Sequence, residues 1–133
     1  MPKVKKPKEF HVFAAVPAQT IADLMVSVIE SLASAHWCTN VEYLKGAVAE
    51  QPAEPWYSRA EYFESDFELR AFDHENSKWY CVGSKEVRDG LELMLRNSPH
   101  RFANILSEEV GSWDMVDADC FFQYVVHGEL VYG

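Results

Sequence analysis

Apolar positions along this chain recur with two different spacings, and each spacing predicts a type of element. Apolar residues three and four apart are typical of an amphipathic helix, and strict alternation is typical of a half-buried strand. The first helical stretch places these apolar side chains on one face: Ile21, Leu24, Val28, Ile29 and Leu32. We expect this helix to end near Ala35.

Alternation or β-rich composition predicts several strands. Residues 37–45 alternate, so that Trp37, Thr39, Val41 and Tyr43 face one way. Residues 67–72 and 78–82 are β-rich and flank five turn-type residues, 73–77, which predicts a hairpin. Two short stretches, 10–16 before Pro17 and 129–132 at the end, are also interpreted as strands.

The second half of the chain has helical spacing. Ser84 is the expected N-cap of a helix whose apolar face ends at Leu95, and Pro99 breaks or restarts it. Residues 102–106 give one further helical face. Acids at the start of 114–128, with His127 and Gly128 at its end, match the helix dipole and the usual C-terminal stop.

This order of elements predicts an α+β fold. We expect a mainly antiparallel sheet of about four strands, with two to four helices packed on one face. Residues 1–8 are expected to form a flexible basic tail, and residues 9–133 a single globular domain. The segment 47–65 carries Pro52, Pro55 and the Trp56-Tyr57 pair, and is expected to be a functional loop or to contain a further short element.

Charge is distributed unevenly along the chain. Four of the 12 Lys and Arg residues lie in the first eight positions, so residues 9–133 hold 8 against 21 Asp and Glu, a formal −13. A body with this charge repels nucleic acid and anionic membranes and attracts basic surfaces. We therefore expect no direct nucleic-acid contact and no membrane contact. No signal peptide is expected, which favours a cytoplasmic location.

No motif for metal binding or catalysis is present. His36 and Cys38 are two residues apart, whereas Cys81 and Cys120 stand alone, and zinc sites usually draw close ligand pairs from two places. We expect no metal and no cofactor, and reduced, partly buried thiols. There is no G-x-S-x-G, P-loop or dinucleotide-binding glycine motif, so no catalytic residue is assigned.

Seven residues are candidate contacts for a ligand or partner: Trp37, Asn40, Trp56, Tyr57, Asp117, Asp119 and Gln123. Trp37 could stack a planar ligand, with neighbouring polar side chains adding specificity. The acids either begin a helix as solvated charges or form a patch for a ligand or basic partner. The Trp56-Tyr57 pair is either exposed as an interface contact or folded back onto the core.

The end of the chain combines Phe122-Gln123 with the stretch from His127 to Gly133, His-Gly-Glu-Leu-Val-Tyr-Gly. This combination resembles the ending of small uncharacterised proteins encoded by phages and prophages. In those, an aromatic-Gln pair precedes a Gly-Glu-x-Val-Tyr-Gly terminus. The early helix leading to Trp37, with Asn40 nearby, is also similar, and Ser34-Ala35 stands where small or glycine residues are expected. The resemblance implies a viral origin and an accessory role, without a chemistry.

Three functions fit these observations. The first is a phage-type accessory protein that binds without catalysis in the host cytoplasm and inhibits a host or defence protein through that protein's basic surface. Its acids fall in two blocks, 61–68 and 108–119. The second is a binder of a nucleotide-like molecule, stacked on an aromatic ring and held by arginine; the candidates are Trp37, Trp79, Tyr124, Arg59, Arg70, Arg88 and Arg101.

The third function is a small enzyme whose acid and base come from separate segments. A homo-oligomer is compatible with the first two functions, because the terminal strand could pair with the sheet edge of a second copy.

Overall fold

The computed structural model describes residues 14–46, 55–107, 109 and 112–133. The predicted basic tail and residues 10–13 of the predicted first strand lie outside these ranges. Residues 14–16 of that prediction are described and are not in a strand. The elements follow in this order: α1 (Ala18–Ile29), β1 (Cys38–Gly46), the 3-10 turns η1 (Trp56–Ser58) and η2 (Ala60–Tyr62), β2 (Phe67–Asp73), β3 (Lys78–Gly83), α2 (Ser84–Asn97), α3 (Pro99–Leu106) and α4 (Met115–His127).

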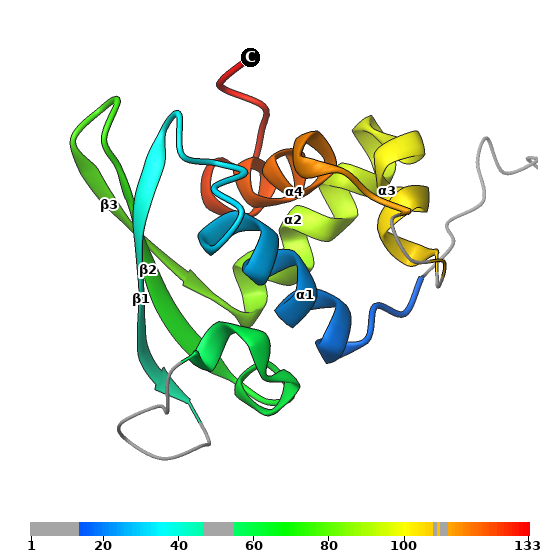
Figure 1. Cartoon of the computed structure of the whole chain (residues 1–133), viewed down its shortest axis with the longest axis horizontal. Helices are drawn as coiled ribbons and strands as arrows, with labels where there is room; N and C mark the ends of the chain where they lie inside the picture. The colour runs from blue at the N-terminus through cyan, green and yellow to red at the C-terminus, as the bar shows by residue number, and fades with distance from the viewer. Residues whose placement is uncertain (1–13, 47–54, 108, 110–111) are drawn as a thin grey trace, which may run out of the picture.

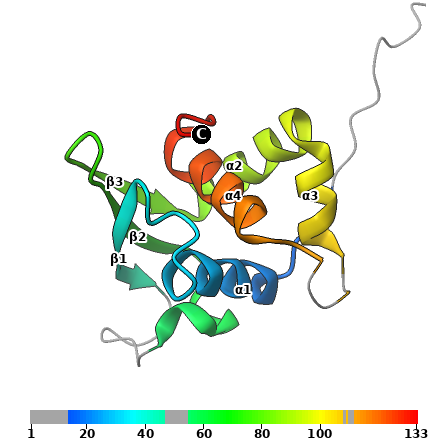
Figure 2. The ribbon, with the colours of Figure 1, turned by 45° about the horizontal axis from the view of Figure 1, so that its top comes forward.

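The described elements form two layers, with the sheet on one side and all four helices on the other (Figures 1 and 2). The sheet is antiparallel in the order β1-β2-β3. The α+β class, the antiparallel pairing and the packing of the helices on one face are therefore confirmed. Within the described residues the sheet has three strands, where about four were predicted.

The central strand shows why only one face of the sheet is covered. Along β2, buried and half-buried positions alternate from Phe67 to Asp73. Phe67, Leu69 and Ala71 pack into the core, as expected for an antiparallel sheet with one face on its helices. The predicted hairpin is confirmed, because β2 pairs with β3 from Glu68 opposite Gly83 to Asp73 opposite Lys78.

Strand β1 departs from the predicted alternation at its start. The register shifts between Cys38 and Asn40, which is the geometry of a bulge. Trp37 lies in the turn before β1, and it and Cys38 are both buried, although strict alternation would place them on opposite faces. Beyond the bulge, Val41 pairs with Ala71, and Val41 and Tyr43 pack against the core, whereas Thr39, which was predicted to share their face, is exposed.

Helix α1 ends at Ile29, well before the predicted end near Ala35. Leu32 has a left-handed backbone with φ of 58°, and the Ala33 amide donates to the Ser27 carbonyl at 3.1 Å. This hydrogen bond closes a turn that follows α1. A left-handed backbone is uncommon for leucine, and the helical spacing of the apolar residues does not predict it.

The ends of the other helices agree closely with their sequence signals. The N-cap of α2 is Gly83 rather than Ser84, whose hydroxyl instead accepts from the Phe67 amide at 3.2 Å. Pro99 is the first residue of α3, so it restarts the helix. Helix α4 begins after Asp114, which accepts from the Asp117 amide, and ends at Gly128 with φ of 73°.

The segment before β2 contains the short elements that its length suggested. Trp56 lies in η1 and is buried, with its ring 5.2 Å from that of Tyr43. Tyr57 is half-buried, and its hydroxyl donates to Glu30 at 3.1 Å. Of the two alternatives for this aromatic pair, the structure has the one in which it folds back onto the core.

Helices α2 and α4 cross at Gly90. A Cβ atom at this position would lie 2.8 Å from the Cα of Val125 and 2.9 Å from its amide nitrogen. Backbone atoms cannot move aside as a flexible side chain can, so the crossing requires glycine.

Replacing Gly90 with alanine should therefore destabilise the fold. Overpacking of this kind typically costs 1–3 kcal/mol, and we expect a loss of about 2 kcal/mol in the free energy of unfolding. Urea denaturation measures it, with Glu92→Ala on the exposed side of the same helix as the matched control. An unchanged midpoint for Gly90→Ala would mean that the two helices do not approach this closely.

Candidate functional site

The last residues of the chain lie along α4 without forming a strand. The side chain of Gln123 holds them: its Oε1 accepts from the amides of Val131 and Tyr132, both at 2.9 Å, and its Nε2 donates to the Tyr132 carbonyl at 3.2 Å. The predicted terminal strand 129–132 was wrong, because a side-chain amide replaces the neighbouring strand as hydrogen-bond partner. A strand that could pair with a second copy therefore does not form at this end.

Asp119, one helical turn before Gln123, holds three separate segments together. Its Oδ1 accepts from the Ser34 hydroxyl at 2.7 Å and from the Trp37 indole at 2.8 Å, and its Oδ2 accepts from Gln123 at 2.8 Å. The half-exposed imidazole of His36 lies 3.5 Å from Oδ2. The carboxylate thus joins the segment after α1 to α4 and, through Gln123, to the C-terminal residues.

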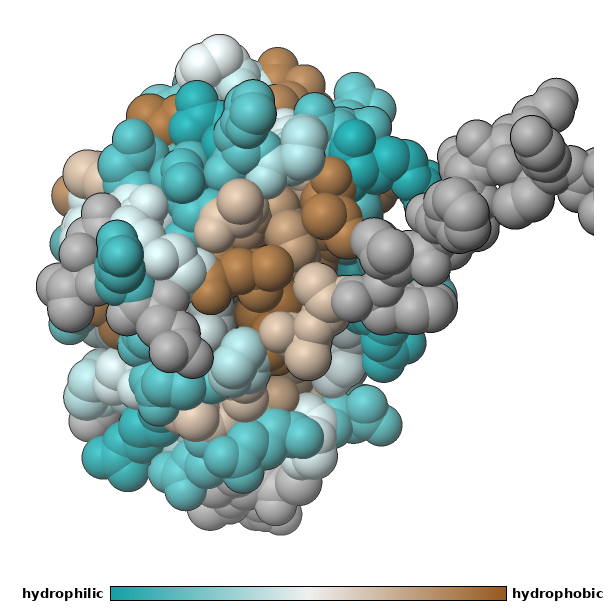
Figure 3. Space-filling model, turned by 90° about the vertical axis from the view of Figure 1, so that its right-hand side faces the viewer, coloured by the Kyte–Doolittle hydropathy of each residue, from teal (hydrophilic) through white to brown (hydrophobic). Residues whose placement is uncertain are grey.

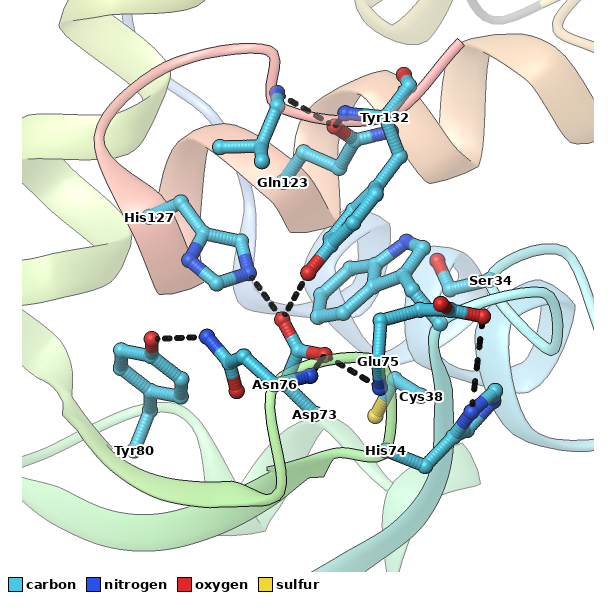
Figure 4. Close-up of polar contacts among 12 residues, drawn as sticks. Ser34, Cys38, Asp73, His74, Glu75, Asn76, Tyr80, Gln123, His127 and Tyr132 are labelled. Carbon is cyan, nitrogen blue, oxygen red and sulfur yellow. Dashed lines mark hydrogen bonds and ion pairs between the residues drawn. The ribbon is translucent and has the colours of Figure 1, made fainter.

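The ring of Tyr132 packs against Trp37 and both neighbouring histidines, His36 and His127. It stacks on Trp37 with centroids 5.7 Å apart and planes 20° from parallel, and meets His127 edge-on at 5.8 Å. Its hydroxyl donates to Oδ2 of Asp73 at 2.6 Å, as Figure 4 shows. The C-terminal residues are in this way tied to the turn between β2 and β3.

Asp73 is fully buried and satisfied on both oxygens. Its Oδ1 accepts from the amides of Glu75 at 2.9 Å and Asn76 at 3.1 Å, which shapes the hairpin turn. The Nε2 of His127 lies 3.0 Å from Oδ2 (Figure 4). The direction of this contact is not that of a hydrogen bond, so it counts as an ion pair when the imidazole is protonated.

These contacts shift several acidities. Burial raises the pKa of Asp73, but the hydrogen bonds from Tyr132 and from the two turn amides, together with nearby His127, outweigh it, so its pKa lies below the usual value. The hydrogen bond to Asp73 raises the pKa of Tyr132 to about 12, and burial raises the pKa of Cys38 to about 12. At neutral pH this phenol and this thiol are therefore protonated, which makes both of them poor nucleophiles.

Asp117 forms a second closed arrangement at the start of α4. It accepts from Arg101 at 2.7 Å on one oxygen, and from Asn104 at 3.0 Å and the Asp114 amide at 3.1 Å on the other. The hydrogen bond to Asp117 raises the pKa of Arg101. This buried carboxylate fastens α3 to α4.

The structure brings three of the seven candidate residues together and separates the others. Trp37, Asp119 and Gln123 belong to one network, all of them buried. Asp117 is buried in its own arrangement, Trp56 and Tyr57 lie against α1 and β1, and Asn40 is exposed on the sheet. Five of the seven therefore have less than a tenth of their surface exposed: Trp37, Trp56, Asp117, Asp119 and Gln123.

Sequence reasoning did not identify Ser34, Asp73, His127 or Tyr132 as members of the network. The C-terminal resemblance contained His127 and Tyr132, but gave them no role. The sequence did contain a sign that Asp73 is buried, because Asp73 continues the alternation that places Phe67, Leu69 and Ala71 on the core side of the strand. A carboxylate on a core-facing position must find hydrogen-bond donors, and this one does.

The face of the sheet turned away from the helices carries a different set of side chains, which we call the outer face. Strand register places them in three rows: Asn40–Phe72–Trp79, Glu42–Arg70–Cys81 and Lys45–Glu68–Gly83. None of the described helices lies on this face (Figure 1).

Trp79 is 39% exposed, and the Arg70 guanidinium lies over its ring at 4.2 Å. At the third row an open hollow of about 350 Å³ is lined by Asp66, Glu68, Glu86, Lys45 and Cys81, among others. The outer face therefore has an aromatic end and an acidic end.

Within the described residues no three His, Cys, Asp or Glu side chains form a group that could hold a metal ion. The three cysteines are free, and only Cys81 is exposed. No helix in the described part of the chain is both long and apolar enough to cross a bilayer.

Comparison of the chain with models of protein families, with curated proteins and with solved structures finds no match. Conclusions about function therefore depend on the geometry of this molecule.

Proposed function

We propose that this protein acts by non-catalytic binding, engaging a protein partner through that partner's basic surface. The observation that supports this most is the acid block before β2. Glu61, Glu64 and Asp66 are exposed, and Glu68 is half-exposed beside them in sequence. Opposite charges on two surfaces accelerate their association and make it sensitive to salt.

The second acid block contributes less to such a surface. Asp117 and Asp119 are buried, and each is hydrogen-bonded within the protein. Asp114 and Glu109 remain exposed. The electrostatic attraction that we propose therefore centres on the block 61–68.

A test compares two variants with the same change of charge. The first, Glu61→Gln/Glu64→Gln/Asp66→Asn, neutralises the acid block. The second, Asp23→Asn/Glu30→Gln/Glu92→Gln, neutralises three exposed acids on α1, at its C-cap and on α2. With polyarginine as the probe, we expect the first to lower the association rate about tenfold at low salt and the second far less. Equal effects would show that net charge alone acts, and the proposal would fail.

The C-terminal resemblance supports the accessory part of the proposal. The residues that carry it, Gln123, His127 and Tyr132, all lie in the network that fixes the chain end. We propose that the protein is a phage-type accessory factor acting in the host cytoplasm on a host or defence protein.

A nucleotide-like ligand is the second candidate, because one of the candidate arginines, Arg70, lies beside one of the candidate aromatic rings, Trp79. Arg70 lies over Trp79, whereas Trp37 and Tyr124 are buried. Arg70 also donates to Glu42 at 2.8 Å, a contact that a phosphate would have to displace. Native mass spectrometry of protein freshly purified at low salt separates the candidates. A reproducible extra mass of a few hundred daltons that leaves on denaturation would favour this ligand over a protein partner.

A further inference from the structure

We infer that the outer face of the sheet is the docking surface for the basic partner, whose apolar side chain meets Phe72 and Trp79 while a lysine or arginine enters the hollow beside Glu68. This inference rests on the proposed function and adds to it the surface and the arrangement of contacts. Its support is the distribution of apolar surface and charge over the three rows.

The aromatic end supplies the apolar contact. Phe72 and Trp79 are direct neighbours across β2 and β3, with ring centroids 5.1 Å apart. Tryptophan and arginine are the residue types most enriched at the energetic centres of protein interfaces, and here Arg70 lies on the tryptophan ring. A sheet face with one exposed ring, Trp79, and one half-exposed ring, Phe72, suits a protein surface better than a small molecule, which requires a concave site.

The middle row fixes the arginine. Its guanidinium donates through Nε to Oε2 of Glu42 at 2.8 Å, with Nη2 2.7 Å from the same oxygen. Because Arg70 is held between this carboxylate and Trp79, little side-chain freedom remains to be lost on binding. The centre of the outer face is therefore preorganised.

The acidic end supplies the charge complementarity. Three carboxylates, those of Asp66, Glu68 and Glu86, line the hollow with a single cation, Lys45, which lies 3.3 Å from Glu68. Gly83 places no side chain in the third row. Besides the carboxylate that Lys45 contacts, a lysine or arginine of the partner would find the exposed Asp66, and Glu86, whose Oε1 already accepts from the Gly83 amide at 2.9 Å while Oε2 remains as an acceptor.

The distance between the aromatic end and the acidic end of the outer face restricts which side chains the partner must present. Phe72 and Glu68 are four residues apart on one strand, which corresponds to ~13 Å at the rise of a β-strand. The partner should therefore present an apolar side chain and a basic side chain about this far apart. Residues four apart on an extended segment meet this condition.

The main competing surface is apolar and lies on the helical side of the molecule. Leu106 ends α3, and Met115 and Val116 begin α4, all three with more than a third of their surface exposed. Figure 3 shows apolar side chains gathered on a face away from the sheet. Nothing in the described residues indicates what would cover this surface, and the described acids beside it in the sequence, Glu109 and Asp114, are fewer than the three carboxylates at the acidic end of the outer face. Val116 on this surface therefore serves as the control position for the variants described below.

Two extended peptides test the inference by NMR on the full-length protein. One has leucine and arginine four residues apart in a threonine-rich background, and the other has glutamine in place of the arginine. We expect the arginine peptide to shift the amide signals of β2 and β3 and the Trp79 indole, and to slow alkylation of Cys81. We expect the glutamine peptide to bind at least tenfold more weakly.

Three variants locate the contact. Trp79→Ser and Cys81→Arg, both at exposed positions, should each weaken the arginine peptide at least tenfold, whereas Val116→Ser should leave its affinity unchanged. Thermal denaturation confirms that each variant is folded.

If the peptide binds but shifts α3 and α4 instead, the docking surface is wrong while the proposed function stands. If the arginine peptide does not bind at low salt, the docking surface is wrong. The proposed function is then also wrong only if the acid-block variant and the control variant with three neutralised acids associate with polyarginine at the same rate. If the outer-face signals broaden with protein concentration alone, the occupant is a second copy and the basic partner is rejected.

Discussion

Replacing Asp119 with alanine is expected to lower the free energy of unfolding by about 4 kcal/mol, because it leaves several buried donors without an acceptor. The Ser34 hydroxyl and the Trp37 indole lose their hydrogen-bond acceptor. The side-chain nitrogen Nε2 of Gln123 loses one of its two acceptors. The effect should extend to the chain end, since Gln123 also positions Val131 and Tyr132. Urea denaturation followed by circular dichroism measures the loss.

The matched control for this prediction is Asp23→Ala. Asp23 is an exposed aspartate on α1 whose only contact in the described structure is with Gln19, at 2.9 Å. Surface substitutions of this kind usually change stability by less than about 0.5 kcal/mol. If Asp119→Ala costs no more than Asp23→Ala, the carboxylate does not organise the network and the contacts around it are incidental.

Local patterns along the chain predicted most of the fold. The β-rich composition of residues 67–72, the turn-type residues 73–77 and the change from acids to glycine along residues 114–128 each predicted an element that the structure has. Where the prediction was wrong, contacts distant in the sequence decide. Helix α1 ends early in a turn after which Ser34 and Trp37 reach Asp119, 85 and 82 residues later in the chain.

The candidate site was predicted in part, for a related reason. Trp37, Asp119 and Gln123 attracted attention as aromatic and polar residues, yet residue type does not reveal whether such a side chain faces a ligand or another part of the same protein. Here each one finds an internal partner. The outer face was missed because Phe72, Trp79 and Glu42 become neighbours only through the register of three strands.

The internal network and the outer face meet at the β2–β3 hairpin. Phe72 and Asp73 are consecutive, with Phe72 on the outer face and Asp73 in the core, where it contacts Tyr132. The chain end thus fixes the hairpin that carries Trp79 and Arg70. A rigid scaffold beneath an exposed contact surface reduces the entropy lost on binding. The same buried carboxylate also makes the stability of the hairpin depend on pH.

The second large effect is therefore expected from Asp73. Its pKa in the folded protein lies below the value of about 3.9 for an unfolded aspartate. The corresponding stability is fully present above about pH 4 and is lost as the pH falls through the folded pKa. Asp73→Asn should cost about 3 kcal/mol near neutral pH, because asparagine keeps only one acceptor oxygen and its NH2 group would face either the two turn amides or the Tyr132 hydroxyl without accepting from them. The difference from the unmodified protein should shrink below about pH 4.

Two further variants make this prediction specific to Asp73. Tyr132→Phe removes the 2.6 Å hydrogen bond that helps keep the carboxylate ionised, so it should raise the pKa of Asp73 and move the acid-induced loss of stability to higher pH. Asp23→Asn removes an exposed carboxylate and should leave the pH profile unchanged. A constant difference between Asp73→Asn and the unmodified protein from neutral pH to about pH 2 would mean that Asp73 has the same pKa in the folded and unfolded states. In that case the hydrogen bonds from Tyr132 and from the turn amides would not favour the ionised form of the carboxylate.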